Sequence, residues 1–395
     1  MTSPSALRFD FLAPARLVFG WGRRAEVGQL AQSLGKRAFV VSGSKSLERS
    51  GGIAQIETVL RQAGLTVVPL ATIGHEPLVA DVDAAVERLS EFAPAAGDLV
   101  VAVGGGSAID LAKAAAALAT NRHGNSVIDF LEGVGRGLKI EIPPLPVLAI
   151  PTTAGTGSEA TKNAVISSTD PPFKKSLRSE LMVPRMVLID PELTVSLRPD
   201  VTAHTGMDAI TQLIESYLSR RAQPIPQALA LNGLQFALPA IATAVADGSN
   251  REARERMAYA AFLSGMALAN SGLGLAHGVA AALGIHCGVP HGLACAVMLP
   301  AALRINCVVR RKEIARLWSL VEPQSRVHGD EAAERFITHI EQLASRIGVP
   351  SRLSQIGVLP EQIPALVQGS RGSSMDGNPR DVSDEELRGL LEEML

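Results

Sequence analysis

The chain has 395 residues, 47% of them hydrophobic, and a formal net charge of −2. This length predicts two or three domains and a large buried core. The near-neutral balance of charges excludes the basic footprint that nucleic-acid binding requires, so we expect no nucleic-acid partner.

The three cysteines, Cys287, Cys295 and Cys307, are an odd number and form no CxxC pair. This pattern argues against a disulfide framework or a zinc knuckle and fits a reducing compartment. The first residues show no charged segment followed by an apolar one, so no secretory signal is predicted. We therefore expect a cytoplasmic protein.

Short apolar strands alternate with helices in the first half of the chain. Strands are predicted at 37–42, 66–68, 98–103 and 146–150, and helices at 54–63, 79–92 and from the glycines after 103 to 118. Pro69 is expected to end the second strand, and 43–46 to form a turn. This alternation indicates a parallel, doubly wound α/β architecture. A β-ribbon is expected from the segments 163–168, 175–178 and 186–189.

The second half of the chain has a different pattern. From Val201 onward the segments are long, rich in Ala and Leu, and helical in their spacing, and a last amphipathic helix is predicted at 384–395. We therefore expect an α/β domain over residues 1–195 and an all-helical domain over residues 196–395.

The stretch from Met257 to Leu303 contains no Lys, Arg, Asp or Glu. A pair of membrane helices is one interpretation, because eighteen or more apolar residues can span a bilayer. Paired Trp/Tyr belts are missing, however, and the Gly-Val-Pro-His-Gly sequence at 288–292 would break a span. We favour two buried helices around a polar pocket and expect no membrane partner.

Three histidines, His277, His286 and His291, lie in this apolar stretch. Each needs a polar partner if it is buried, and a lone buried histidine is often only a satisfied core residue. Three of them close to a Gly/Pro turn make a metal site a hypothesis to test against the rest of the chain.

A glycine-rich loop, VAVGGGSAIDLAK at 101–113, follows a predicted apolar strand. Its glycines allow close backbone approach, and Ser107 with Asp110 is predicted to form a capping box at the start of the next helix. A helix N-terminus suits a pyrophosphate. The spacing matches neither GxGxxG nor a Walker motif, so a plain tight turn is the alternative.

A second loop, PTTAGTGS at 151–158, also follows a predicted strand and is rich in small hydroxyl residues. Crevice ligands of open α/β sheets bind outside the carboxyl ends of the strands, so two such loops favour a dinucleotide. The candidate cofactor-binding residues of the two loops are Gly105, Gly106, Ser107, Asp110, Thr152, Thr153 and Thr156.

A predicted helix at 206–217 carries Asp208 and Gln212, which are four residues apart and share one face. Taken alone, they are a surface carboxylate and a surface amide. Together with His277 and His291, one aspartate and two histidines reach the count of three protein ligands that is typical of catalytic metal sites. Imidazole and carboxylate suit zinc or iron.

Five motifs occur in order: GGGSAIDLAK, IPTTAGTGSEAT, TGMDAITQLIESYLS, GLAHGVAAALG and GVPHGLACAVMLP. As a set they resemble the iron-containing (group III) alcohol dehydrogenases over nearly the whole chain. The resemblance implies a Rossmann-like α/β N-terminal domain, an all-helical C-terminal domain and a cleft between them. It also implies hydride transfer between a nicotinamide and a small alcohol or aldehyde. We further expect a homodimer or a larger homo-oligomer.

The resemblance places three of the family's four metal ligands at Asp208, His277 and His291, and implies one divalent metal, iron or zinc, that polarises the substrate oxygen. Asp208 and His277 are thereby the catalytic candidates. The fourth family ligand is a histidine where this chain has Gln212. Related glycerol dehydrogenases use Asp and two His on zinc. Many members also carry a relay histidine where this chain has Ala281, with His286 as a possible substitute.

The cofactor position departs from the family pattern as well. NAD-preferring members often carry an acidic residue after the first strand, whereas this chain has Gly43, Ser44 and Lys45. Nothing in this turn repels a 2′-phosphate, so we favour NADP over NAD, with mild discrimination. Lys174, or Lys175 if the register differs by one, matches a family lysine near the cofactor.

Three alternatives remain open. A reductase similar to maleylacetate reductase would transfer hydride without a metal, and Gln212 favours it. A lyase of the dehydroquinate synthase type would need several basic residues in the cleft, where the motifs here are apolar. A nucleotide-binding protein without activity would require that Gln212 and Ala281 mark lost chemistry.

Overall fold

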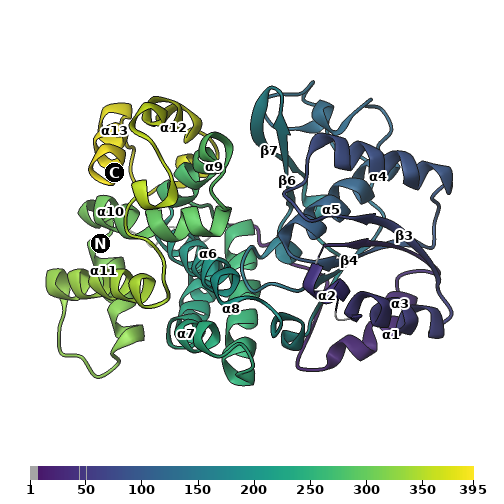
Figure 1. Ribbon diagram of the computed structural model, residues 1–395, viewed down its shortest axis with the longest axis horizontal. Helices are drawn as coiled ribbons and strands as arrows, with labels where there is room; N and C mark the ends of the chain where they lie inside the picture. The colour runs from purple at the N-terminus through teal and green to yellow at the C-terminus, as the bar shows by residue number, and fades with distance from the viewer. Residues whose placement is uncertain (1–7, 44, 50) are drawn as a thin grey trace.

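A computed structural model describes residues 8–43, 45–49 and 51–395. The chain forms two parts that lie side by side, an α/β part from the first half and a helical part from the second (Figure 1). The fold class predicted from the sequence is confirmed. The proposed division at residues 195 and 196 falls in the connection between the last strand and the first long helix.

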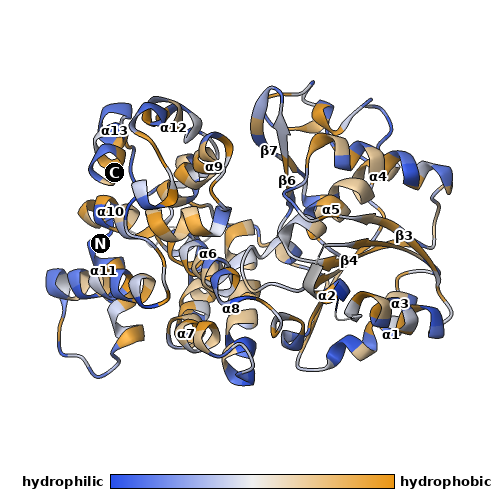
Figure 2. Cartoon of the chain, in the orientation of Figure 1, coloured by the Kyte–Doolittle hydropathy of each residue, from blue (hydrophilic) through white to orange (hydrophobic). Residues whose placement is uncertain are grey.

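The main sheet has six parallel strands in the order β1-β8-β5-β4-β2-β3. The strands are β1 (Arg16–Phe19), β2 (Arg37–Ser42), β3 (Thr66–Thr72), β4 (Asp98–Gly104), β5 (Val147–Pro151) and β8 (Met186–Ile189). Every residue of β4 and β5 is buried. Near-continuous apolar runs are what a parallel sheet covered on both faces requires, and the main strands are among the most apolar parts of the chain (Figure 2).

Helices cover both faces of this sheet. Val101 of β4 packs in one core with α1 (Val27–Gln32) and α3 (Gly52–Gln62). Its neighbour Val100 packs in another core with α4 (Val79–Glu91) and α5 (Gly106–Thr120). Because successive side chains of a strand point to opposite faces, this division shows the doubly wound arrangement that the sequence predicts.

The second strand does not end at Pro69, and that prediction is wrong. β3 continues to Thr72, and its pairing with β2 shifts register between Val40 and Val41, so that Leu70 has no partner. β3 lies at the edge of the sheet. An edge strand tolerates proline because one side of its backbone has no neighbouring strand to bond to. The bulge also interrupts the ladder of hydrogen bonds locally.

The ribbon is also smaller than predicted. β6 (Asn163–Thr169) and β7 (Pro172–Arg178) form an antiparallel hairpin, but β8 lies in the main sheet between β1 and β5. All four residues of β8 are buried, and Val187 and Ile189 join the core of the helical part. A strand that is buried on both faces cannot belong to an exposed ribbon.

Eight helices of the described chain pack around one core in the second part. They are α6 (Pro199–Leu218), α7 (Pro224–Ala246), α8 (Arg251–Ala269), α9 (Leu275–Cys287), α10 (His291–Val321), α11 (Gly329–Arg346), α12 (Ile363–Gly369) and α13 (Asp384–Glu393). The charge-free stretch is divided among α8, α9 and α10, so it forms parts of three helices and not two.

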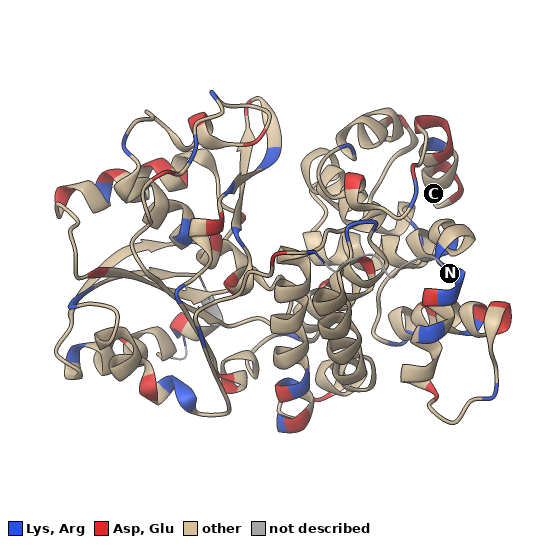
Figure 3. Cartoon of the chain, turned by 180° about the vertical axis from the view of Figure 1, so that it is seen from behind, with Lys and Arg blue, Asp and Glu red and all other residues tan. Residues whose placement is uncertain are grey.

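Two helices, α7 and α10, are long and apolar enough to cross a membrane by length and composition. In their most apolar windows, however, 44% and 50% of the residues are buried inside the protein. Core helices pass the same test, so these two helices are weak evidence for a membrane span. Seen from behind, acidic and basic residues are interspersed along the chain (Figure 3).

A buried lysine ties α5 to the segment that follows β5. The Lys113 Nζ donates to the carbonyl oxygens of Ser158 (2.8 Å) and Thr161 (3.2 Å), and it lies 3.4 Å from Asp110 Oδ1. The other oxygen of Asp110 accepts from the backbone N–H of Val165 at 3.0 Å. These contacts hold the second loop and the start of β6 against α5, and so position one wall of the expected cofactor site.

Glu159 is buried in the same region, and burial raises its pKa to about 7, against the opposing effect of Lys113. The folded state therefore binds this proton more tightly than the unfolded state, where the carboxyl has its ordinary pKa. The stabilising contribution is complete below the unfolded pKa and is lost as the pH rises through about 7.

We expect Glu159→Gln to flatten the pH dependence of the free energy of unfolding between pH 5 and 8.5. A shift of this size corresponds to about 3 kcal/mol that the wild type loses over this range and the neutral amide does not. Urea unfolding at several pH values measures it. Glu180→Gln, with a carboxylate that is 74% exposed, is the control. Parallel profiles of the wild type and Glu159→Gln would contradict the assignment.

Candidate active site

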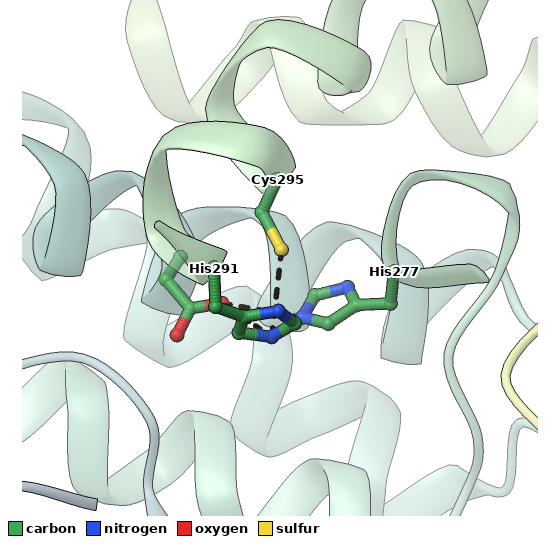
Figure 4. A group of neighbouring side chains, drawn as sticks. His277, His291 and Cys295 are labelled. Carbon is green, nitrogen blue, oxygen red and sulfur yellow. Dashed lines mark hydrogen bonds and ion pairs between the residues drawn. The ribbon is translucent and has the colours of Figure 1, made fainter. Parts of the chain in front are cut away.

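Four side chains from three helices converge in the helical part. They are Asp208 on α6, His277 on α9, and His291 and Cys295 on α10, and one ligand atom of each lies within 4.8 Å of the others. Figure 4 shows the two imidazoles and the Cys295 sulfur directed toward one point. The short turn at 288–290 between α9 and α10 brings the two histidines to the same place.

The distances within this group are short. Asp208 Oδ1 lies 3.2 Å from His277 Nε2 and 4.0 Å from His291 Nε2. Cys295 Sγ lies 3.7 Å from His291 Nε2. Asp208, His277 and Cys295 are buried, whereas the His291 side chain is 28% exposed, so the group borders solvent on the His291 side.

A carboxylate orients His277. Its Nδ1 lies 2.6 Å from Glu215 Oε2, and the other oxygen of Glu215 accepts from the backbone N–H of Ala276 at 2.7 Å. Because a carboxylate accepts, Nδ1 must donate, which leaves Nε2 facing Asp208. Metal-ligating histidines are typically held by such a partner.

Sequence reasoning missed Glu215. It lies seven residues after Asp208, two helical turns along the same buried face of α6, and this spacing is the signal that would have found it.

The start of α9 is anchored to the C-terminal turn. Asn378 Oδ1 accepts from the backbone N–H of Leu275 (3.1 Å) and from Asn306 Nδ2 (2.9 Å). Asn378 Nδ2 in turn donates to Asn306 Oδ1 at 2.9 Å. This buried pair of amides fixes the first turn of α9, and with it the place of His277.

Two members of the group are in the charge state that a metal ion requires. Burial alone would raise the pKa of Asp208, but its hydrogen bond to His277 and the nearby histidines lower it below its ordinary value. Burial, helped by the Lys174 ammonium, lowers the pKa of His291 to about 4. At neutral pH the group therefore offers an ionised carboxylate and a neutral imidazole, the forms that bind metals.

Two buried carboxylates, Asp208 and Glu215, lie on either side of His277. Burial alone would lower the pKa of His277, but Cys295, Glu215 and Asp208 outweigh it and raise that pKa well above its ordinary value. Paired carboxylates in a dry interior are costly without a positive charge. The site therefore favours a positive charge at His277. A proton on the imidazole or a metal ion bound to it can supply that charge.

Gln212, the family position of the fourth ligand, is engaged elsewhere. It lies one turn after Asp208 and is buried, but its Oε1 accepts from Ser264 Oγ at 2.7 Å. Its Nε2 donates to the carbonyl oxygen of Thr156 at 3.3 Å. The amide thus links α6 to α8 and to the second loop of the α/β part.

The two predicted loops meet at the carboxyl ends of β4 and β5. A Cβ on Gly106 would lie 2.8 Å from the Thr156 side chain, so only glycine permits this approach, and Gly105 lies next to Thr153. The backbone N–H of the buried Thr152 donates to the carbonyl oxygen of Gly104 at 2.9 Å. The structure therefore brings the candidate residues of both loops together.

The predicted capping box is wrong. Gly105 is the N-cap of α5, and in the described chain no side chain caps this helix. Ser107 lies inside the first turn, and Asp110 is turned inward to Val165 and Lys113, because the interior offers it a buried cation. We therefore leave Asp110 out of the cofactor site proposed below.

The expected turn after β2 is short. Gly43 packs so closely on α5 that an added Cβ would lie 2.6 Å from Ala108 Cβ. Ser44 and the side chain of Lys45 lie outside the described residues, and a short helix, α2 (Lys45–Arg49), occupies the place where a longer turn was predicted.

The β6–β7 hairpin of the α/β part carries a lysine that acts on His291. Lys174 Nζ lies 2.7 Å from Glu76 Oε1, and the lysine contributes to the lowered pKa of His291. Of the two lysines that sequence reasoning left open, Lys174 is the one whose charge affects His291. Glu76 was missed, since nothing in the sequence pairs it with residue 174.

His286 does not replace the missing relay histidine. It is exposed and lies near α12, where a Cβ added to Gly369 would be 2.9 Å from His286 Nε2. His286 follows His277 by nine residues, which places it on the opposite side of α9, whereas Ala281 follows by one turn on the same side. The prediction that His286 could substitute for the relay histidine at position 281 is therefore wrong.

Comparison with known proteins agrees with this geometry. Residues 14–191 match the family described as iron-containing alcohol dehydrogenase, and residues 202–395 match the C-terminal part of the Fe-containing alcohol dehydrogenase family. The chain belongs to the iron-containing alcohol dehydrogenase family. It is therefore an oxidoreductase.

Individual proteins are similar over their whole length. The NAD-dependent methanol dehydrogenase of Bacillus methanolicus is 32% identical, covering 98% of this chain and 100% of its own. The 1,3-propanediol dehydrogenase of Klebsiella pneumoniae is 33% identical, with 97% and 98% covered. The crystal structure of a 1,3-propanediol oxidoreductase superposes with a TM-score of 0.90 at 32% identity, with 98% and 100% covered.

We expect Glu215→Gln to weaken metal binding by about 10- to 100-fold, the usual effect of removing the partner that orients a ligating histidine. The amide no longer forces the tautomer of His277, while the shape of the side chain is kept. Titration of zinc against a competing chelator measures the affinity. Glu361→Gln, at an exposed position, is the control. Equal affinities of Glu215→Gln and the wild type would rule out this role.

Proposed function

We propose that this protein is a metal-dependent, NAD(P)-linked alcohol dehydrogenase or aldehyde reductase that acts on small alcohols or aldehydes. The observation that carries the proposal is the convergence of Asp208 and His291 on His277, whose orientation Glu215 fixes. The substrate class is supported by the names of relatives, which act on methanol and 1,3-propanediol.

Asp208, His277 and His291 would hold one divalent ion, iron or zinc. Their fit to a metal rests on an ionised carboxylate, a neutral His291 and a buried negative charge that needs a cation. A bound metal supplies Lewis-acid polarisation of the substrate oxygen. The buried Leu275 and Val279 of α9 help to keep water out of this region.

The cofactor would lie on the two loops. The free backbone N–H groups at the start of α5, from Gly106 and Ser107, suit a pyrophosphate, and the neighbouring Thr153 and Thr156 supply hydroxyl groups. The Lys174 ammonium lowers the pKa of His291, which supports a place for Lys174 near the cofactor. We propose that both NAD and NADP are accepted, with a mild preference for NADP, because Gly43 leaves no acidic side chain at the end of β2.

Three further features belong to the same proposal. The chain would divide into an α/β domain over 1–195 and a helical domain over 196–395, with the connection between η5 (Pro191–Thr194) and α6 as the boundary. It would act in the cytoplasm. It would form a homodimer or a larger homo-oligomer.

One observation favours a second candidate. The family's fourth ligand position holds a neutral amide whose oxygen accepts from Ser264, and a reductase without metal would need no ligand there. Family membership favours both reductases over the lyase and over a nucleotide-binding protein without activity.

We expect His277→Ala to lose the metal and to lower kcat/KM by roughly 10³-fold, since a Lewis acid contributes several kcal/mol to the transition state. Elemental analysis and NADPH oxidation with short aldehydes measure the two effects. His286→Ala, which changes an exposed histidine on the same helix, is the control. Full activity of completely chelated wild type would instead establish the metal-free alternative.

We expect kcat/KM for NADH and NADPH to differ by less than about tenfold, and Lys45→Ala to shift the ratio toward NADH by up to about fivefold. A single lysine paired with a phosphate in contact with water contributes only about 0–1 kcal/mol to such a preference. Steady-state kinetics with both cofactors measures it, with Lys36→Ala as the control. Gly43→Asp is unsuitable, because its Cβ would collide with Ala108. A roughly hundredfold NADH preference in the wild type would refute the argument.

A further inference from the structure

Cys295 stands out among the residues that the proposed activity does not use. It lies on α10 one turn after His291, and its side chain is fully buried. The Sγ belongs to the same group of converging atoms as Asp208 and both histidines, all within 4.8 Å of one another. Figure 4 shows the Cys295 sulfur above the two imidazoles and directed at them.

The four atoms lie near enough to one another to be compared with the ligands of a tetrahedral zinc site. Zinc holds N and O ligands at about 2.0–2.1 Å and sulfur at about 2.3 Å, which separates neighbouring ligand atoms by roughly 3.3–3.6 Å. Three of the six separations are 3.2 Å, 3.7 Å and 4.0 Å, and the other three do not exceed 4.8 Å. Small side-chain rotations therefore suffice to bring all four atoms into contact with one ion.

The alternative fourth ligand, Gln212, is less available. Its oxygen already accepts from the buried hydroxyl of Ser264, and its nitrogen holds the second loop. Binding a metal through Gln212 would require the Ser264 hydroxyl to turn wholly to the carbonyl oxygen of Ala261, 2.7 Å away, and would strain the link from Gln212 to Thr156. Cys295 Sγ, by contrast, lies 3.7 Å from His291 Nε2, itself a member of the group.

We propose that Cys295 is the fourth protein ligand of the metal and that the set Asp208, His277, His291 and Cys295 selects zinc over ferrous iron. This rests on the proposed metal-dependent function. A thiolate is a soft ligand, and soft ligands favour zinc, whereas Gln212 offers only a neutral amide oxygen.

On binding, the S–H bond of Cys295 breaks, a sulfur–metal bond forms, and the proton passes to solvent, with no change in oxidation state. Catalytic zinc sometimes expands to five-coordinate in the transition state, and the assignment requires such an expansion for a substrate oxygen to bind as an additional ligand.

Cobalt(II) is a suitable probe, because thiolate ligation gives an intense near-ultraviolet charge-transfer absorption that oxygen and nitrogen ligands do not give. The full-length protein would be stripped of metal with a chelator and titrated with cobalt(II) alone. We expect a thiolate band that saturates at one ion per chain in the wild type and is lost in Cys295→Ser. Cys307→Ser, which changes a half-buried cysteine on the same helix, should keep the band.

Metal selectivity gives a second measurement. In anaerobic competition between zinc and ferrous iron, Cys295→Ser should lower the zinc-to-iron ratio in the protein by at least about tenfold relative to the wild type. X-ray absorption of the zinc-loaded wild type should show one sulfur at about 2.3 Å. This last measurement needs no variant, so it tests the proposal even where Cys295→Ser fails to fold.

Stoichiometric cobalt binding without a thiolate band would overturn the role of Cys295 and leave the metal-dependent function standing. A band that persists in Cys295→Ser would overturn it too. Cobalt(II) and zinc that fail to bind the wild type would overturn the proposed metal-dependent function itself.

Discussion

The hydrogen bond between Glu215 and His277 is the interaction on which the site depends. It sets the tautomer of His277, and it places a second buried carboxylate two turns from Asp208 on the same helix. Two negative charges in a dry interior need a cation between them. The helical core around α6, α9 and α10 is thus built to surround a charged centre, although the stretch that forms most of it carries no charge.

Contacts across the two parts connect this centre to the sheet. Gln212 reaches from α6 to the backbone of Thr156, Lys113 holds the same loop from the opposite side, and Lys174 extends from the hairpin toward His291. The loop that meets the start of α5 is therefore fixed by both parts. A change at Gln212 would alter the packing of this loop as well as the site, since one side chain serves both.

Under the proposed assignment, this chain replaces the family's histidine ligand at position 212 with a cysteine ligand at position 295. The position one turn after Asp208 has become a link between helices, and the position one turn after His291 supplies a sulfur. The number of protein ligands stays at four, and the donor set becomes softer. The change in chemistry requires no change in fold, because both positions lie on the inner faces of helices that are already present.

Local sequence patterns were sufficient to predict much of the fold and much of the candidate site. The spacing of apolar residues determined the parallel α/β half, the helical half and most helices and strands within a few residues, because periodicity reflects which face is buried. The motifs around Asp208, His277 and His291 were enough to expect a metal, and the two loops after strands were enough to expect a dinucleotide.

Only the tertiary structure decided where individual side chains point. Pro69 is tolerated because β3 lies at an edge of the sheet. β8 belongs to the main sheet because its side chains fill the cores on both faces. Asp110 pairs with Lys113 and does not cap the helix. Gln212 turns to Ser264, 52 residues away in the chain, which left Cys295 to be recognised from its neighbours. Such choices depend on competing partners from distant segments, and a local pattern carries no information about them.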